Sequence, residues 1–157
     1  MREVEDTFHL LHKLSQGQDE GLVHKVPNKD FIASLKNLDL DTCYISGHSF
    51  GGATALKALK VCRRINGEPI FQKALLYDSW LFPIRAEAES LISTGQNSNV
   101  MFINCEKFQS SKNISITKHF ETPIADVGLK TNVITLRNTL HYARETSFDT
   151  LLLFRKC

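Results

Sequence analysis

A serine between two glycines, at the end of an apolar run and the start of a helical pattern, constrains this chain more than any other feature. The motif is Gly47-His48-Ser49-Phe50-Gly51, within the segment DTCYISGHSFGGATALKALKVCRR (41–64), and it fits the pattern G-x-S-x-G. Glycines at these positions are needed where a strand turns sharply into a helix, because a Cβ would clash between the two elements. Such a turn lifts the serine out of the sheet. The context therefore predicts that Ser49 is a nucleophile.

The start of the helix after Ser49 suits the negative charge that develops on an ester oxygen under attack. The first N–H groups of a helix have no intrahelical partner and point toward an anion. We therefore expect the backbone N–H of Phe50, the residue after the serine, to be one oxyanion donor.

Short apolar runs predict buried strands, and helical patterns separate them. The predicted strands are 42–46, 73–78, 100–105 and 132–136. Each run is nearly continuous rather than alternating, as in strands covered on both faces. The predicted helices are 3–14, a short one near 30–37, 51–64, 85–93, 111–119 and one after His141 that includes the terminal LLLFRKC. The alternation predicts an α/β fold with a mainly parallel sheet.

The position of the strand at 42–46 is unusual. It carries the serine turn and should be central, yet no strand-like run precedes it. Either the sheet starts at this strand, with an exposed edge, or the chain lacks the beginning of the fold. The second alternative is preferred.

Length and composition predict one globular domain and exclude few functions. The chain has 157 residues, of which 42% are apolar and 23% charged, with a net charge of +2. A basic cluster closes the helix predicted at 51–64, where cations suit the helix dipole, so no nucleic-acid partner is expected. No apolar stretch approaches the roughly 20 residues of a transmembrane span. The N-terminal segment is not typical of a signal peptide, and the compartment is left open.

The cysteines do not predict a metal site. They are Cys43, Cys62, Cys105 and Cys157. No C-x-x-C pair or other metal-ligand spacing is present, and buried free thiols are the default interpretation. No metal and no cofactor are expected.

A nucleophilic serine needs a histidine base, and the base needs an orienting acid. After a G-x-S-x-G turn the chain order is serine, acid, histidine. Of the six histidines, His9, His12 and His24 precede the serine motif and do not fit this order. His48 is the variable residue of the motif, and His119 lies in a polar segment. His141 follows the last predicted strand, so its position favours it as the base.

Two acidic residues compete for the third role. Asp78 ends the run KALLYD, and Glu106 follows the next run, VMFINC, which is the commoner place for the acid. Asp126, in a loop, and Asp149, after the histidine, are weaker candidates. Spacing alone leaves the choice between Asp78 and Glu106 open.

Four segments of this chain resemble the platelet-activating-factor acetylhydrolase family, which comprises serine-dependent, calcium-independent phospholipases with an α/β-hydrolase fold. The segments are GHSFGGAT (47–54), LLYDSWLFPI (75–84), MFINCEKFQ (101–109) and VITLRNTLHYARETSFD (133–149). Together the resemblance spans roughly residues 35 to 155. It implies one α/β-hydrolase catalytic domain over 1–157 that lacks the fold's first strands, the loop supplying a second oxyanion N–H, and its C-terminal end.

The resemblance also implies the chemistry of the site. It assigns Ser49 as the nucleophile, Asp78 as the acid and His141 as the base, and it implies no metal and no cofactor. The implied reaction is hydrolysis of a short or oxidised acyl chain at the second glycerol position of a phospholipid, such as the acetyl group of platelet-activating factor. The substrate would be met at a membrane or lipoprotein surface, and family members occur both secreted and intracellularly.

Three side chains after the acid are candidates for the acyl side of the pocket. They are Trp80, Leu81 and Phe82. Plain core packing is an equally good interpretation of these three. Two alternative functions remain for the chain: another carboxylesterase that shares the serine turn, or a catalytically inactive fragment.

Overall fold

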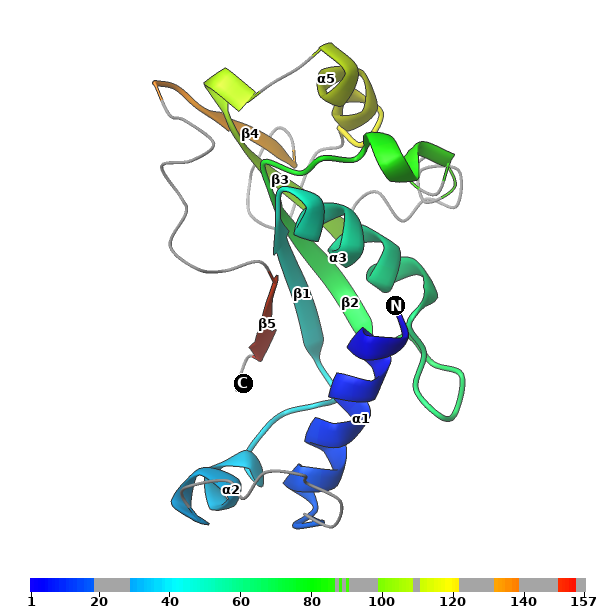
Figure 1. Ribbon diagram of the computed structural model, residues 1–157, viewed down its shortest axis with the longest axis vertical. Helices are drawn as coiled ribbons and strands as arrows, with labels where there is room; N and C mark the ends of the chain where they lie inside the picture. The colour runs from blue at the N-terminus through cyan, green and yellow to red at the C-terminus, as the bar shows by residue number, and fades with distance from the viewer. Residues whose placement is uncertain are drawn as a thin grey trace.

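A five-stranded sheet organises the molecule, with strand order β4-β3-β2-β1-β5. This computed structural model describes residues 1–18, 29–86, 88, 90, 99–108, 111–121, 132–138 and 150–154. The strands are β1 (Cys43–His48), β2 (Phe71–Tyr77), β3 (Val100–Cys105), β4 (Val133–Leu136) and β5 (Thr150–Phe154). Strands β1 to β4 are mutually parallel, and β5 runs antiparallel to β1. Figure 1 shows the strands side by side, with α3 across the face of β1 and β2.

The helices confirm most of the predicted pattern. The described α-helices are α1 (Arg2–Ser15), α2 (Lys29–Leu35), α3 (Phe50–Val61) and α5 (Ser111–Lys118). The 3-10 turns η1 (Phe82–Ile84) and η3 (Glu106–Phe108) lie between α3 and α5 in the chain. In the helix predicted at 85–93, the described residues are helical, and the others lie outside the described part. A mainly parallel sheet flanked by helices is the architecture of the α/β-hydrolase fold. None of the described helices is long and apolar enough to cross a membrane.

Helix α3 ends earlier than predicted. The pattern predicts a helix over 51–64, but Cys62 already has extended dihedrals, and Arg63 forms a β-bridge with Pro69. A tight turn with Gly67 at φ 86° then leads toward β2. The buried face of α3 consists of glycine, alanine and leucine, which allows the helix to pack closely on the sheet.

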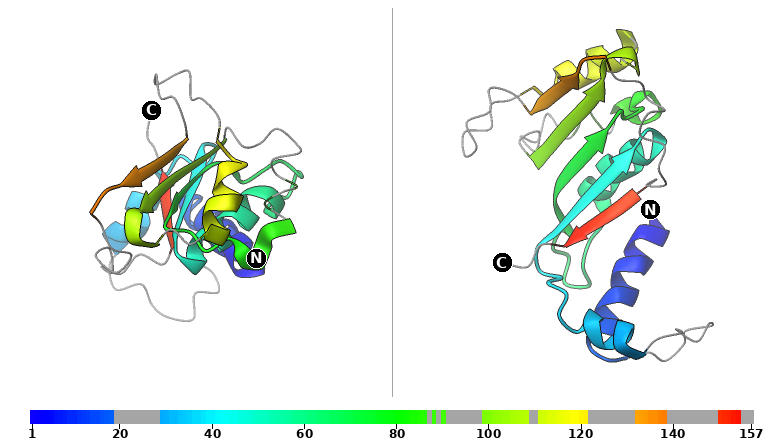
Figure 2. Two further views of the ribbon diagram at one scale, coloured as in Figure 1. Left: turned by 90° about the horizontal axis from the view of Figure 1, so that it is seen from above. Right: turned by 90° about the vertical axis from the view of Figure 1, so that its left-hand side faces the viewer.

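The C-terminal expectation is wrong for residues 150–154. They form β5, paired with β1 from Gly47↔Thr150 to Cys43↔Phe154, instead of a helix. Figure 2 shows β5 beside β1. Periodicity cannot distinguish a short apolar strand from a buried helix, and the edge of β1 offers unpaired backbone groups. Residues 150–154 therefore pair with the side of β1 opposite β2.

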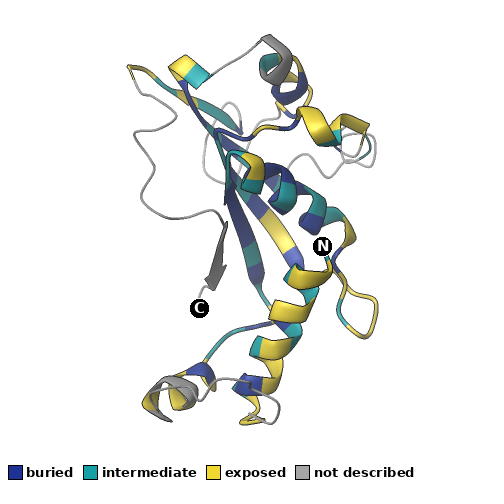
Figure 3. Cartoon of the chain, in the orientation of Figure 1, coloured by how far each residue is buried: buried dark blue, intermediate teal, exposed yellow. Residues whose placement is uncertain are grey.

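The hydrophobic core lies between the sheet and α3. Its large side chains include Ile45, Leu56, Phe71, Leu76 and Phe102, all 2% exposed or less. Figure 3 shows the buried residues along β1, β2 and β3, whereas many residues of α1 are exposed. From α1, the side chain of Phe8 is part of this core.

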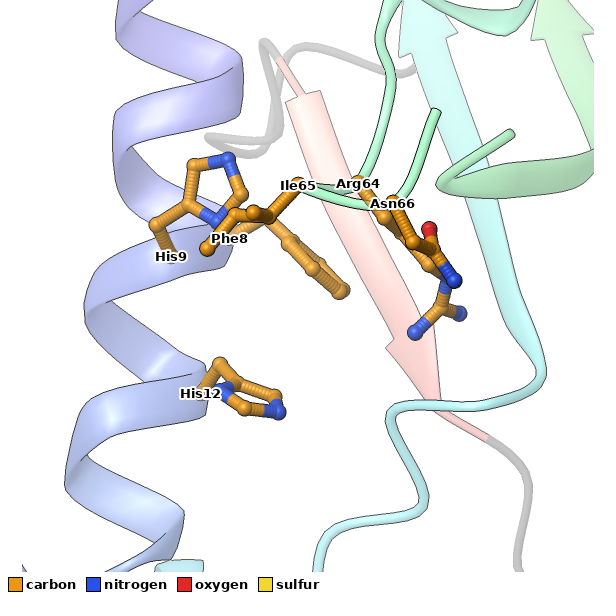
Figure 4. Close-up of a pocket in the computed structure, with 6 residues that line it drawn as sticks. All are labelled: Phe8, His9, His12, Arg64, Ile65 and Asn66. Atoms are coloured by element: carbon orange, nitrogen blue, oxygen red, sulfur yellow. The ribbon is translucent and has the colours of Figure 1, made fainter. Parts of the chain in front are cut away.

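Arg64 fixes α1 against the end of α3. Its guanidinium lies 5.2 Å from the ring centroid of Phe8, and its Nη2 donates to the carbonyls of Leu40 at 2.6 Å and Asp41 at 3.0 Å. A shallow pocket of about 320 Å³ opens beside this contact. Figure 4 shows His9 and His12 reaching it from α1, with Ile65 and Asn66 opposite. Because Arg64 follows the C-terminal end of α3, this pocket lies at the end of the helix away from Ser49.

Candidate active site

Ser49 lies in a sharp turn between β1 and α3 and has strained backbone dihedrals. Its φ is 55° and its ψ −121°, a conformation that costs a non-glycine residue about 1–3 kcal/mol. Three backbone hydrogen bonds hold it there. The Ser49 N–H donates to the carbonyl of Tyr77 at 3.0 Å, and the Ser49 carbonyl accepts from the N–H groups of Gly52 at 3.1 Å and Trp80 at 2.9 Å. The turn is therefore set by its neighbours in both β2 and α3.

Two glycines leave the space that this turn needs. A Cβ on Gly47 would overlap the carbonyl of Gly51 and lie 2.7 Å from the nitrogen of Gly52. Those atoms are backbone and cannot rotate away. A Cβ on Gly52 would overlap the hydroxyl of Ser79 and lie 2.6 Å from the Ser79 Cβ. The G-x-S-x-G pattern already predicts that position 47 must be glycine. The contact that requires glycine at position 52, with Ser79, is visible only in the packed structure.

Phe50 is the first residue of α3. Its N–H therefore belongs to the four that an α-helix leaves without an intrahelical acceptor. The side chain of Ser49, at the N-cap position, makes no capping hydrogen bond. This geometry is compatible with the expected oxyanion role of the Phe50 N–H.

Asp78 follows β2 at the same edge of the sheet as Ser49. In the parallel register, His48 pairs with Tyr77, so the residues that come next, Ser49 and Asp78, leave adjacent strands at one level. Asp78 is fully buried and has a φ of 43°. Its N–H donates to the carbonyl of Ile103 at 3.1 Å, and its Oδ1 accepts the N–H of Cys105. Backbone groups of β3 therefore hold both the backbone and the carboxylate of Asp78.

Glu106, the other candidate acid, has different surroundings. It is the first residue after β3 and is exposed. Its Oε2 accepts a hydrogen bond of 2.8 Å from the N–H of Asn138, in the turn after β4. In the strand order, β3 is separated from β1 by β2. Of the two candidates, Asp78 is the one that follows the strand paired directly with β1.

The proposed base lies outside the described residues. So do His24 and the two weaker acid candidates, Asp126 and Asp149. The described chain continues through β4 to Asn138, three residues before His141. His119 is exposed after α5 and has no described link to Ser49.

The three candidate pocket residues differ in exposure. Leu81 is fully buried in the core, whereas Trp80 and Phe82 are each 48% exposed. The ring of Trp80 meets the ring of Phe50 edge to face, with the centroids 6.3 Å apart. Aromatic surface thus lies next to the nucleophile in both sequence and space. In the described part of the chain, no three His, Cys, Asp or Glu side chains gather as metal ligands would.

Comparisons with known proteins identify the family. Residues 1–151 match the family "Platelet-activating factor acetylhydrolase, isoform II". The chain is 30% identical over 136 residues to platelet-activating factor acetylhydrolase of Gallus gallus, covering 85% of this chain and 28% of the relative. The protein of that name from Bos taurus is 33% identical over 111 residues, covering 70% of this chain and 22% of the relative.

A third relative and the solved structures complete the comparison. The platelet-activating factor acetylhydrolase of Canis lupus familiaris is 29% identical over 142 residues, or 89% of this chain and 28% of the relative. The chain thus spans less than a third of the length of these relatives. No solved structure matches it significantly. The resemblance found from the four sequence segments is confirmed, and the chain belongs to the platelet-activating factor acetylhydrolase, isoform II family.

Proposed function

We propose that this chain carries the catalytic residues of a phospholipid esterase. Ser49 is the nucleophile, His141 the base and Asp78 the orienting acid. The observation that carries the proposal is the strained turn at Ser49, hydrogen-bonded to residues on both sides of the buried Asp78. Strain of this kind persists only where the surrounding structure over-determines it, and it clusters at active sites.

The reaction would proceed through an acyl-enzyme. Ser49 Oγ attacks the ester carbonyl carbon as its proton passes to His141, and the N–H of Phe50 donates to the resulting oxyanion. The C–O bond then breaks, and the alcohol leaves with the proton held by His141. Water, deprotonated by His141, attacks the acyl-enzyme, and the acid is released as His141 gives the proton to Ser49 Oγ. Asp78 keeps the imidazole in the correct tautomer and stabilises its cation.

The substrate we propose is a phospholipid with an acetyl, short or oxidised acyl chain at the second glycerol position. The names of the relatives support acetyl hydrolysis. The half-exposed rings of Trp80 and Phe82, and Phe50 at 59% exposure, supply apolar contact area for a short acyl chain or for the lipid surface that presents it. We place the encounter with substrate at a membrane or lipoprotein surface.

Labelling with a fluorophosphonate, read by intact mass, tests the proposed nucleophile. Such probes phosphonylate a serine whose base and oxyanion site are assembled. We expect one adduct on the wild-type chain, none on Ser49→Ala, and one on the matched control Ser115→Ala, which alters an exposed serine of α5. A folded wild-type chain that forms no adduct would overturn the proposal.

A substrate panel then tests the specificity. Acetylated phospholipid should be hydrolysed in preference to a soluble aryl ester and to a phospholipid with two long acyl chains. A preference for the aryl ester would indicate a general carboxylesterase that shares the serine turn.

A further inference from the structure

Two consecutive residues at the carboxyl end of β3 hold the segments on either side of it. The N–H of Cys105 donates to Asp78, which follows β2. The carboxylate of Glu106 accepts from the N–H of Asn138, which follows β4, at 2.8 Å. The end of β3 is thus hydrogen-bonded both to the proposed acid and to the chain that leads to the proposed base.

Asn138 lies in the turn through which the chain leaves β4. Its φ is 56°, in the left-handed region, which asparagine adopts more readily than most residues. Strand β4 ends at Leu136, paired with Cys105, so only Arg137 separates the ladder from this turn. A backbone N–H held by a carboxylate in such a turn makes a charge-assisted hydrogen bond, which is shorter and stronger than a neutral one.

We propose that Glu106 is a positioning residue for the proposed reaction: by holding the N–H of Asn138, it directs the chain from β4 toward His141. This role rests on the proposed function, because it needs His141 as the base. Glu106 does not orient the imidazole itself in this assignment. Its exposed carboxylate is engaged by a backbone N–H, whereas Asp78 is buried beside the strand of the nucleophile.

A conservative and a truncating variant of Glu106 distinguish two roles: positioning the chain through the Asn138 N–H, and orienting the imidazole as the acid. Glu106→Gln keeps an oxygen that accepts the Asn138 N–H, and Glu106→Ala removes it. If Glu106 positions the chain, the rate of fluorophosphonate labelling should fall about tenfold in Glu106→Ala and less than about twofold in Glu106→Gln, since small misplacements of a catalytic group are costly. The control Glu68→Ala removes an exposed carboxylate near the opposite edge of the sheet and should leave the rate unchanged.

Two further measurements, amide exchange at Asn138 and the pH dependence of labelling, distinguish the positioning role from a general contribution to stability. Amide hydrogen exchange at Asn138 should accelerate in Glu106→Ala but not in Glu106→Gln. The pH midpoint of the labelling rate, which reports the base, should stay at its wild-type value in both variants, because the acid that interacts with the imidazole is Asp78.

Each alternative outcome decides against part of the assignment. A Glu106→Gln variant as slow as Glu106→Ala, with a lowered pH midpoint, would make Glu106 the acid and overturn the positioning role. Wild-type labelling of Glu106→Ala would overturn the positioning role alone. Unchanged amide exchange at Asn138 in Glu106→Ala would show that the hydrogen bond is dispensable and would also refute the positioning role. A folded wild-type chain that is not labelled would overturn the proposed function and, with it, this role.

Discussion

The N–H of Trp80 donates a hydrogen bond of 2.9 Å to the carbonyl of Ser49. On the other side of Asp78, the carbonyl of Tyr77 accepts the N–H of Ser49 at 3.0 Å. The backbone of the proposed nucleophile is thus joined to the chain on both sides of the proposed acid, at Tyr77 and at Trp80. A substitution that displaces either segment is expected to displace the other.

Gly47→Ala should abolish fluorophosphonate labelling and lower the free energy of unfolding by about 1–3 kcal/mol or more, as overpacking does. The new Cβ would overlap the backbone carbonyl of Gly51, which cannot move without opening the first turn of α3. Urea denaturation and intact-mass labelling measure the two effects.

Gly67→Ala is the matched control for backbone strain. Gly67 has a φ of 86° and open space around the position of a Cβ, far from Ser49 in the chain. The Gly67→Ala variant should lose about 1–2 kcal/mol in free energy of unfolding, because alanine must adopt the left-handed conformation, and its labelling rate should stay the same. Normal labelling of Gly47→Ala would contradict the close approach of strand and helix.

Gly52→Ala should be rescued in part by a second substitution at Ser79. A Cβ added at position 52 would overlap the Ser79 hydroxyl and meet its Cβ at 2.6 Å, whereas the Ser79 Cα lies 3.1 Å away. In Gly52→Ala/Ser79→Gly only the last contact remains, and a shift of a few tenths of an ångström relieves it. Urea denaturation of both single variants and the double variant should give a favourable coupling of about 1 kcal/mol or more. Additive effects would show that α3 and the segment after Asp78 are not in contact there.

Asp78→Asn should lower the labelling rate by about 10⁴-fold while leaving stability close to the wild type. The amide oxygen can still accept the N–H of Cys105, and asparagine tolerates the positive φ, but the charge that stabilises the imidazolium is gone. Asp78→Ala should also lose about 1–3 kcal/mol, since the Cys105 N–H would lose its acceptor. Thermal denaturation beside labelling separates the two variants, and an Asp78→Asn chain that labels normally would exclude Asp78 as the acid.

The buried thiols predict a loss of stability at alkaline pH. Burial raises the pKa of Cys43 and of Cys62 from the ordinary 9.0 to about 11. The unfolded chain therefore releases these protons first, between about pH 9 and pH 11, and the free energy of unfolding falls as the pH rises through that window. Below about pH 9 the thiols are protonated in both states and contribute no pH dependence.

Cys43→Ala/Cys62→Ala provides the comparison for this prediction. The two proteins differ only at these thiols, so the difference in slope isolates their contribution. Urea unfolding under reducing conditions at pH 7, 9, 10 and 11 should show a shallower decline for the double variant. Parallel declines would mean that the two thiols ionise as readily in the folded chain as in the unfolded one.

The sequence by itself determined the features that depend on short segments. The turn at Ser49 follows from local sterics, because a glycine two residues before a serine, between an apolar run and a helical pattern, has few other structural explanations. Strands β1 to β4 were predictable for the same reason, since each is one continuous apolar run. The serine turn and the acids that follow the neighbouring strands can therefore be recognised from local patterns alone.

Only the tertiary structure decided what depends on which segments become neighbours. Spacing left the choice between Asp78 and Glu106 open, and the resemblance favoured Asp78. The strand order adds a difference that no spacing gives: Asp78 follows β2, which lies beside β1, whereas Glu106 follows β3 and bonds to the turn after β4. The terminal apolar run became β5 instead of a helix because the edge of β1 offered unpaired backbone groups, which no local pattern encodes. Backbone sterics act within a few residues and can be predicted from them, whereas strand pairing and packing are chosen among partners far apart in the chain.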